Sequence, residues 1–323
     1  MNHNFGRSAF LSGAAAAAFV PRALSAQSLM TIRIGSTPQM SVSAALYAQA
    51  STAFQKNGLD VTITAMNSGA AIIAAILGGS LEFGNLSMLN LVEAHARSLP
   101  LVIESAASVY SSDLRDAIGL IVAKDSPLRT GRDLNGKTLA VPALGDTFTI
   151  AGSTWIDKTG GDSTTVKFLE LPNAAAAEAI ANGRCDAAIL VQPTLRNAVS
   201  AGKCRIIADP FAAIAPRFVS TVYACSADFA AKNPAVVARF RKVIIDSGSY
   251  VNAHVPEVLP LMAKFSSVDL AVLANLPFTR MGSTQALKDA HATIQPLIDV
   301  AAKYKAIPHA YDAKELIDPA ALT

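Results

Sequence analysis

A pattern of strand, polar loop and helix occurs twice in the chain, about a hundred residues apart. Residues 138–141 (T-L-A-V) form a short β-prone run, and the loop Gly145-Asp146-Thr147 then opens a helix from about Phe148. Residues 30–42 have the same order of elements. Backbone N–H groups at the start of such a helix attract anions and polar groups. The repeat predicts two similar units, each with a binding loop in the same place.

Strands and helices alternate through the first unit. Alternating or short apolar runs predict strands at residues 31–36, 59–65, 81–84 and 99–104. Apolar residues at helical spacing predict helices at residues 42–56, 72–77 and 87–97. This alternation implies βαβ units and a mostly parallel sheet with helices on both faces. Ligands bind at the carboxyl ends of such strands, so the loops 37–41, 67–69 and 85–87 are candidate binding segments.

The second half of the chain predicts a second lobe. G-G-S-L-E-F-G at residues 78–84 parallels N-G-R-C-D-A-A at residues 182–188, and 323 residues are enough for two domains. The apolar runs 117–123 and 219–225 flank the second unit, and we expect them to cross between the lobes. Lobe 1 then comprises residues 27–116 and 222–323, and lobe 2 comprises residues 117–221. The tail of lobe 1 should be helical at residues 234–254, 256–265, 268–276 and 283–304.

The first 26 residues have the layout of a secretory signal peptide. Arg7 precedes an apolar stretch at residues 10–20, and small residues follow, with cleavage expected near Ala26. The R-S-A-F-L run at residues 7–11 resembles a twin-arginine signal with Ser8 in place of the second Arg, so both export routes stay open. No cysteine lies near the cleavage site, which excludes a lipoprotein anchor. We expect a mature protein in the periplasm that does not span the membrane.

Composition narrows the partners and the chemistry. The net charge is +3 and no basic run alternates with aromatic residues, so we expect no nucleic-acid partner. Cys185 and Cys204 each begin an expected strand, and a disulfide between them is possible in an oxidising compartment. Cys225 fits a buried free thiol. The histidines show no ligand spacing, so we expect no metal and no cofactor.

Four motifs follow one another along the chain: K-D-S-P-L at residues 124–128, D-L-N-G-K-T-L-A-V-P at 133–142, G-R-C-D-A-A-I-L-V-Q-P at 183–193 and A-D-F-A-A-K-N-P at 227–234. In this order they resemble the periplasmic substrate-binding proteins of ABC importers, in the branch for nitrate, sulfonates, taurine and thiamine precursors. The resemblance covers essentially the whole mature chain. It implies a type II periplasmic-binding fold, α/β, with two Rossmann-like lobes joined by two crossing strands and hinge closure around a ligand. It also implies a monomer without enzymatic activity that binds a small organic solute, such as a sulfonate, a carboxylate or an aromatic compound, and docks on a membrane permease.

The resemblance places ligand contacts on the loop after the first strand, on helix starts that face the cleft and near the crossings. The implied residues are Thr37, Pro38, Gln39, Met40, Ser68, Gly69, Ser87, Tyr110, Thr147, Phe148, Thr149, Gln192 and Thr221, with Met88, Gly145 and Ser220 beside them. Several have a simpler structural explanation. Ser68 and Ser87 fit helix caps, and Met40 and Met88 fit core positions.

Basic residues are rare on the expected cleft loops. Arg115 near the hinge, Arg196 within a helix and Arg280 in the tail are the candidates. An anion would then be held by helix ends and hydroxyl groups rather than by a bidentate arginine, and a neutral or aromatic ligand is an alternative. An enzyme on the same fold would need paired carboxylates, an activated nucleophile or a cofactor site, and the sequence shows none of these patterns. A ligand-sensing receptor that presents its closed form to a membrane sensor is a further alternative to a transport protein.

Overall fold

The computed structural model of the chain describes residues 1–2, 29–114 and 117–323. The expected export signal, apart from its first two residues, and Arg115 lie outside the described residues. Within the described ranges, no helix combines the length and the apolar character needed to cross a bilayer.

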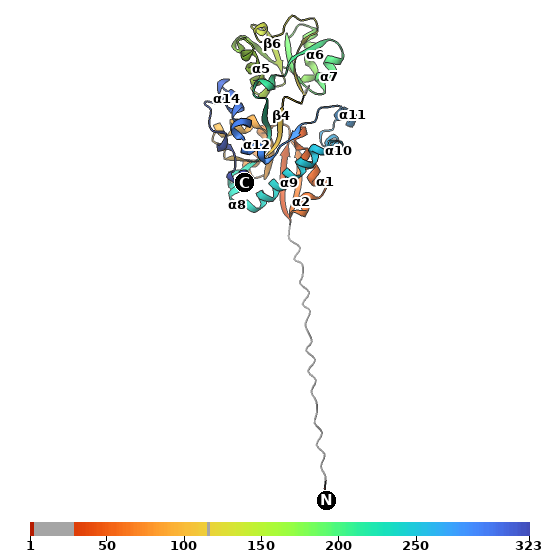
Figure 1. The fold of residues 1–323 in the computed structure, drawn as a ribbon, viewed down its shortest axis with the longest axis vertical. Helices are drawn as coiled ribbons and strands as arrows, with labels where there is room; N and C mark the ends of the chain where they lie inside the picture. The colour runs from red at the N-terminus through yellow and green to blue at the C-terminus, as the bar shows by residue number, and fades with distance from the viewer. Residues whose placement is uncertain (3–28, 115–116) are drawn as a thin grey trace.

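Two separate β-sheets organise the chain (Figure 1). The first sheet has six strands in the order β11-β4-β10-β3-β1-β2, and the second has five in the order β7-β6-β8-β5-β9. The first contains β1 Met30–Ser36, β2 Leu59–Ala65, β3 Phe83–Ser87, β4 Leu101–Ser111, β10 Arg217–Ser226 and β11 Arg280–Met281. The second contains β5 Ile118–Ala123, β6 Thr138–Val141, β7 Lys167–Glu170, β8 Ala187–Val191 and β9 Cys204–Ala208.

The repeat in the sequence is also a repeat in topology. β2-β1-β3 in the first sheet and β7-β6-β8 in the second are both parallel, and the first strand of each unit lies in the middle. In each sheet an antiparallel strand follows, β10 beside β3 and β5 beside β8. The prediction of two similar α/β units is confirmed.

Apolar alternation fixes how the first strands pair. Ile32 and Ile34 of β1 are fully buried, and they lie opposite Val61 and Ile63 of β2. A slip of one residue would move these side chains to the other face of the sheet, so the sequence pattern specifies the register.

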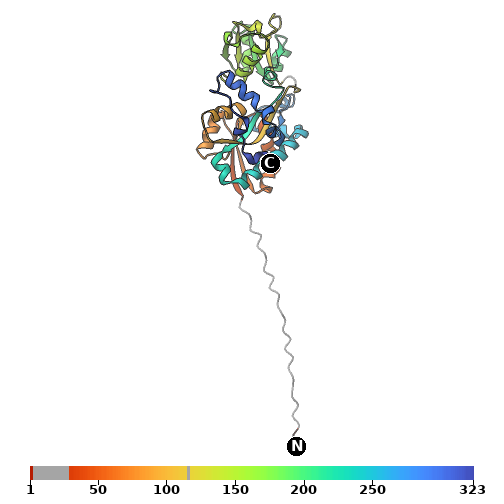
Figure 2. The same ribbon diagram turned by 60° about the vertical axis from the view of Figure 1, so that its left-hand side comes forward.

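Helices cover the sheets and also extend between them. They are α1 Ser43–Ala50, α2 Ala53–Lys56, α3 Gly69–Leu77, α4 Met88–Ala96, α5 Thr147–Lys158, α6 Asn173–Ala181, α7 Thr194–Ser200, α8 Ala227–Lys232, α9 Pro234–Ala253, α10 Val255–Ser266, α11 Leu270–Leu273, α12 Thr284–Lys288, α13 Ala290–Thr293 and α14 Gln295–Lys303. In Figure 1 α5, α6 and α7 lie with the second sheet, while α8, α9 and α10 lie with the first. α14 lies at the junction, directly below the second sheet's body in both views (Figures 1 and 2).

Two helices predicted as continuous are divided. The predicted helix 42–56 is broken at Thr52, whose φ of 60° is left-handed and cannot continue a right-handed helix. The predicted helix 283–304 is three shorter helices, α12, α13 and α14. Apolar periodicity persists through both breaks, so the pattern alone did not reveal them.

The chain passes between the sheets twice, before β5 and before β10. The run 117–123, expected to cross, is β5 and pairs only with β8 and β9 of the second sheet. The run 219–225, expected to cross back, lies within β10 and pairs with β3 and β4 of the first sheet. Residues 217–221, assigned by sequence to lobe 2, therefore pair with the sheet of lobe 1.

The three cysteines are buried free thiols. Cys185 and Cys204 share one hydrophobic cluster in the second unit. The strands near them are not adjacent, because β5 lies between β8 and β9, and the disulfide considered from the sequence is not formed. The expectation of a buried free thiol at Cys225 is confirmed.

Candidate functional site

A cavity of about 510 Å³ lies between the two sheets, at the carboxyl ends of β1, β3, β6 and β8. This edge is where open α/β sheets bind ligands. The first sheet and its loops contribute Pro38, Gln39, Met40, Ser41, Ser87, Ser108, Val109, Tyr110, Phe218, Ser220 and Thr221. The second unit and the passages between the sheets contribute Leu114, Ala117, Ile118, Thr147, Phe148, Val191, Gln192, Pro193 and Phe211.

Most of the residues predicted from the sequence line this cavity. Those that do are Pro38, Gln39, Met40, Ser87, Tyr110, Thr147, Phe148, Gln192 and Thr221, together with Ser220. Thr37, Ser68, Gly69 and Thr149 are not among the lining residues. Ser68 is an exposed cap of α3 and accepts a hydrogen bond from the N–H of Ala71 at 3.2 Å, as its simpler explanation predicted. Ser87 caps α4 and also lines the cavity.

The start of α5 is closed by its own cap. Asp146 Oδ1 accepts the N–H groups of Phe148 at 2.9 Å and Thr149 at 3.0 Å. The hydroxyl of Thr149 donates to the carbonyl of Ala143 at 3.1 Å. The carboxylate thus occupies two of the N–H groups that the start of this helix could offer to a ligand.

The cap also brings a negative charge close to the cavity. Burial raises the pKa of the Asp146 carboxyl to about 6, although the hydrogen bonds from Thr149 and Phe148 oppose the rise. Asp146 is therefore largely ionised above neutral pH. Thr147 and Phe148, the next two residues, line the cavity.

Three hydroxyl groups form one cluster on the cavity wall. Ser108 Oγ hydrogen-bonds to Thr221 Oγ1 at 2.5 Å and to Ser220 Oγ at 2.8 Å. Their strands β4 and β10 are antiparallel neighbours. Hydroxyls both donate and accept, so the cluster can reorient to meet either a carbonyl or an N–H of a ligand.

Asn85 holds the loop after β1 in place. Its Oδ1 accepts hydrogen bonds from Ser41 Oγ at 2.7 Å and from Gln39 Nε2 at 3.2 Å, and the residue is buried. These hydrogen bonds orient the side chains of Gln39 and Ser41, and both residues line the cavity. In the sequence, only the position of Asn85 directly after the predicted strand 81–84 points to this role.

Four aromatic rings pack together in one apolar part of the wall. Phe211 lies with its ring centroid 5.6 Å from Tyr110, 5.2 Å from Phe148 and 5.8 Å from Phe218. Tyr110 also lies 5.0 Å from Phe218. These rings come from β4, β10, α5 and the 3-10 turn Pro210–Ala213, so elements of both units meet here.

Tyr110 is fixed by a carboxylate behind the wall. Its hydroxyl donates to Asp209 Oδ2 at 2.7 Å, and Asp209 also accepts the N–H of Phe211 at 3.0 Å. Burial raises the pKa of Tyr110, and the Asp209 carboxylate raises it further. The Tyr110 hydroxyl therefore stays protonated and directed at Asp209.

No Asp, Glu, Lys, Arg or His occurs among the described residues that line the cavity. Arg196 is exposed on α7 and is not a lining residue, and Arg280 is paired with Asp113 at 3.7 Å, also outside the lining. Among the described residues, no group of three or more His, Cys, Asp or Glu could hold a metal ion.

One wall of the cavity was not predicted from the sequence. It consists of residues from α10, α11 and the segment that follows: Met262, Ser266, Val268, Leu273, Leu276, Pro277, Phe278 and Thr279, with Leu297 of α14. Their apolar spacing indicates only amphipathic helices. Their approach to the cavity depends on how the tail packs across the first sheet.

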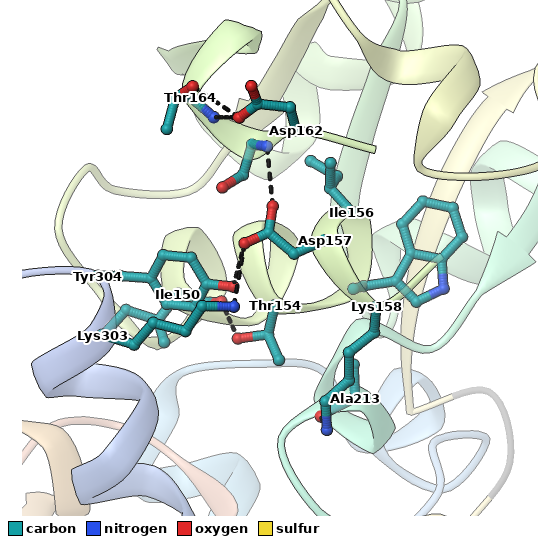
Figure 3. Close-up of polar contacts among 12 residues, drawn as sticks. Ile150, Thr154, Ile156, Asp157, Lys158, Asp162, Thr164, Ala213, Lys303 and Tyr304 are labelled. Carbon is teal, nitrogen blue, oxygen red and sulfur yellow. Dashed lines mark hydrogen bonds and ion pairs between the residues drawn. The ribbon is translucent and has the colours of Figure 1, made fainter. Parts of the chain in front are cut away.

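The other end of α5 is bonded to α14 (Figure 3). Asp157 Oδ2 accepts hydrogen bonds from the Tyr304 hydroxyl at 2.8 Å and from Lys303 Nζ at 3.1 Å. Asp157 Oδ1 accepts the N–H of Ser163 at 2.9 Å. Beside it, Lys158 Nζ donates to the carbonyl of Ala213 at 2.7 Å, in the segment that returns to the first sheet (Figure 3).

Comparison with known proteins agrees with this architecture. Residues 39–257 match the model of a family described as NMT1/THI5 like. The chain belongs to the NMT1/THI5-like family. A taurine-binding periplasmic protein from Escherichia coli strain K12 is 29% identical over 240 residues, which cover 71% of this chain and 72% of that protein.

Solved structures show the same fold. The periplasmic aliphatic sulphonate binding protein SsuA from Escherichia coli superposes with a TM-score of 0.72 at 19% identity, covering 89% of this chain and 97% of the other. The nitrate-binding protein NrtA from Synechocystis PCC 6803 gives a TM-score of 0.67 at 13% identity, covering 89% and 84%. The predicted periplasmic-binding fold is confirmed.

Proposed function

We propose that this chain captures a small organic solute in the cavity between its two sheets and delivers it to the membrane permease of an ABC importer. The observation that carries the proposal is the position of the cavity, whose walls come from both α/β units. A solute in it contacts both units at once, so binding favours a closed arrangement that a permease can distinguish from the open one.

The family match and the taurine-binding relative support the role in import. The names of the solved relatives make sulfonates and nitrate the first solutes to test. We also propose that the protein is exported with cleavage near Ala26, works as a monomer in the periplasm and turns over no substrate. Its lobes would then be residues 27–116 with β10 and the helical tail, and residue 117 to the end of β9.

The test is to purify the protein under native conditions and extract what it carries. We expect mass spectrometry to find one small compound. Unfolding and refolding should remove it and lower the melting temperature, and adding it back should restore the melting temperature with saturation. The proposal fails if nothing is extracted and no member of a panel of sulfonates, aromatic carboxylates, amides, nitrate, pyrimidines and amines raises the melting temperature. Consumption of a panel member would instead indicate an enzyme.

A further inference from the structure

We propose that the solute is uncharged: a small molecule with an aromatic or aliphatic body and a polar group that meets the hydroxyl cluster of Ser108, Ser220 and Thr221. This inference rests on the proposed function and names the class of solute that the cavity takes.

The size and lining of the cavity call for an organic body. Its volume of about 510 Å³ lies within the range of small-molecule sites, roughly 300 to 1,000 Å³. An inorganic anion would fill a small part of it. Tyr110, Phe148, Phe211 and Phe218 contribute an apolar wall that can only be used by carbon-rich surface.

The polar groups of the described wall are neutral. Ser108, Ser220 and Thr221 offer hydroxyls, and Gln39 adds an amide that is held by Asn85 at 3.2 Å. Such groups satisfy a carbonyl, amide or hydroxyl of a ligand. A buried anion is held best by a positively charged partner, because an ion loses much of its hydration when it leaves water.

Among the described residues, two carboxylates lie directly behind the cavity lining and disfavour an anion, while Arg280, next to the lining residue Thr279, is paired with Asp113. Asp146 occupies the start of α5, directly before the lining residues Thr147 and Phe148. Asp209 lies behind Tyr110 and accepts its hydroxyl at 2.7 Å. At α5, the attraction that a helix start exerts on anions is thus already satisfied by the protein's own carboxylate. Both carboxylates accept hydrogen bonds from the protein and stay outside the lining, so neither forms a direct ion pair with a ligand cation.

Probes that share a shape and differ in charge test this inference. The first pair is benzenesulfonamide and benzenesulfonate, and the second set is benzamide, benzoate and benzamidinium. Affinities are measured by calorimetry at pH 8 on the refolded protein, freed of any compound it carried. We expect the neutral member to bind at least about tenfold tighter than each charged counterpart. Equal or tighter binding of a charged member would overturn the inference.

The compound extracted from the native protein decides the case in which no probe binds. A compound that is neutral at pH 7 supports the inference. An anionic or cationic compound overturns it and leaves the role in solute binding intact. Finding neither a compound nor any binding solute counts against the proposed function itself.

A variant pair isolates the effect of the carboxylate. Asp146→Asn keeps a cap on α5 and removes its charge, so we expect the affinity for benzenesulfonate relative to benzenesulfonamide to rise about threefold or more. Asp162→Asn is the control, since Asp162 caps the short 3-10 turn Ser163–Thr165 and does not adjoin the lining residues. An unchanged ratio in Asp146→Asn would show that this carboxylate does not select against anions.

Discussion

Helix α5 contacts the rest of the protein at both ends, and the two ends use different chemistry. At its start Thr147 and Phe148 line a cavity whose described residues carry no charge. At its end Asp157 is bonded to Lys303 and Tyr304 of the α14 segment (Figure 3). Both ends connect the second sheet's unit to elements that lie with the first.

The comparison shows where this protein places its ionic contacts between the two units. The contact of α5 with α14 can use an ion pair because it stays partly solvated, with the Lys303 side chain 56% exposed. The cavity end uses rings and hydroxyls, and its carboxylate is turned toward backbone N–H groups of α5. A ligand that binds at the start of α5 therefore displaces water and covers apolar surface. It does not break the ionic contact between Asp157 and Lys303 at the end of α5.

The largest effect should come from removing the ring that joins the two units at the cavity. Phe211→Ala should lower the free energy of unfolding by about 3 kcal/mol, because Phe211 is 6% exposed and packs against three other rings. Urea denaturation measures the change. Phe211→Leu keeps most of the volume and should cost about 1 kcal/mol. A loss below about 1 kcal/mol for Phe211→Ala would mean that packing among these rings does not stabilise the contact between the two units at the cavity.

The two ends of α5 should respond to pH in opposite directions. The folded protein raises the pKa of Asp146 to about 6, mainly by burial. The folded state then binds more protons than the unfolded state between about pH 4 and 6, so stability falls as the pH rises through this window. Burial also acts on Asp157, but the hydrogen bonds from Ser163, Tyr304 and Lys303 outweigh it and lower the pKa. The contribution of Asp157 is therefore present above about pH 4 and is lost below it.

Unfolding curves from pH 3 to 7 test this contrast. Asp146→Asn should remove about 2 kcal/mol of the fall between pH 4 and 6. Asp157→Asn should remove part of the loss below pH 4 and leave the upper window unchanged. The contrast would be refuted by parallel pH profiles of the two variants.

Cutting the contact with α14 should have a smaller effect on stability. Asp157→Ala removes an acceptor for two side chains and one backbone N–H and should cost about 1 to 2 kcal/mol, since part of the pair is exposed to solvent. The control is Asp246→Ala, which breaks an exposed pair with Lys242 within α9 and should cost below about 0.5 kcal/mol. Equal losses of unfolding free energy in the two variants would mean that the contact between α5 and α14 stabilises the protein no more than an ordinary surface ion pair.

The sequence predicted the repeated framework well because the framework is local. Strands β1, β2 and β6 and helix α9 follow from alternation, apolar spacing and turn residues within short windows. The cap on α5 can also be predicted, since Asp146 directly precedes the helix. The same polar loop fits a ligand-binding segment, and the sequence alone does not separate the two roles. The wall from α10 and α11 was not predictable, because it depends on contacts between residues more than a hundred positions apart.

The smallest effect distinguishes two threonines that the sequence treated alike. Thr147 lines the cavity, whereas the Thr149 hydroxyl is bonded to Ala143 and Asp146. Thr147→Val should change solute affinity by a few fold with little effect on stability. Thr149→Val should cost about 0.5 to 1 kcal/mol of stability with unchanged affinity. Calorimetry and urea denaturation on both variants separate these outcomes. A change of affinity in Thr149→Val but not in Thr147→Val would mean that the ligand contacts α5 at Thr149.

One measurement tests most directly whether the cavity at the start of α5 is the binding site. Thr147→Trp places an indole in the cavity, and Thr164→Trp places the same ring at an exposed position of the second unit. Titration with the compound that co-purifies, or with the tightest neutral probe if none does, should show at least about a tenfold loss of affinity for Thr147→Trp and no loss for Thr164→Trp. Full affinity in a folded Thr147→Trp protein would contradict the assignment of the site.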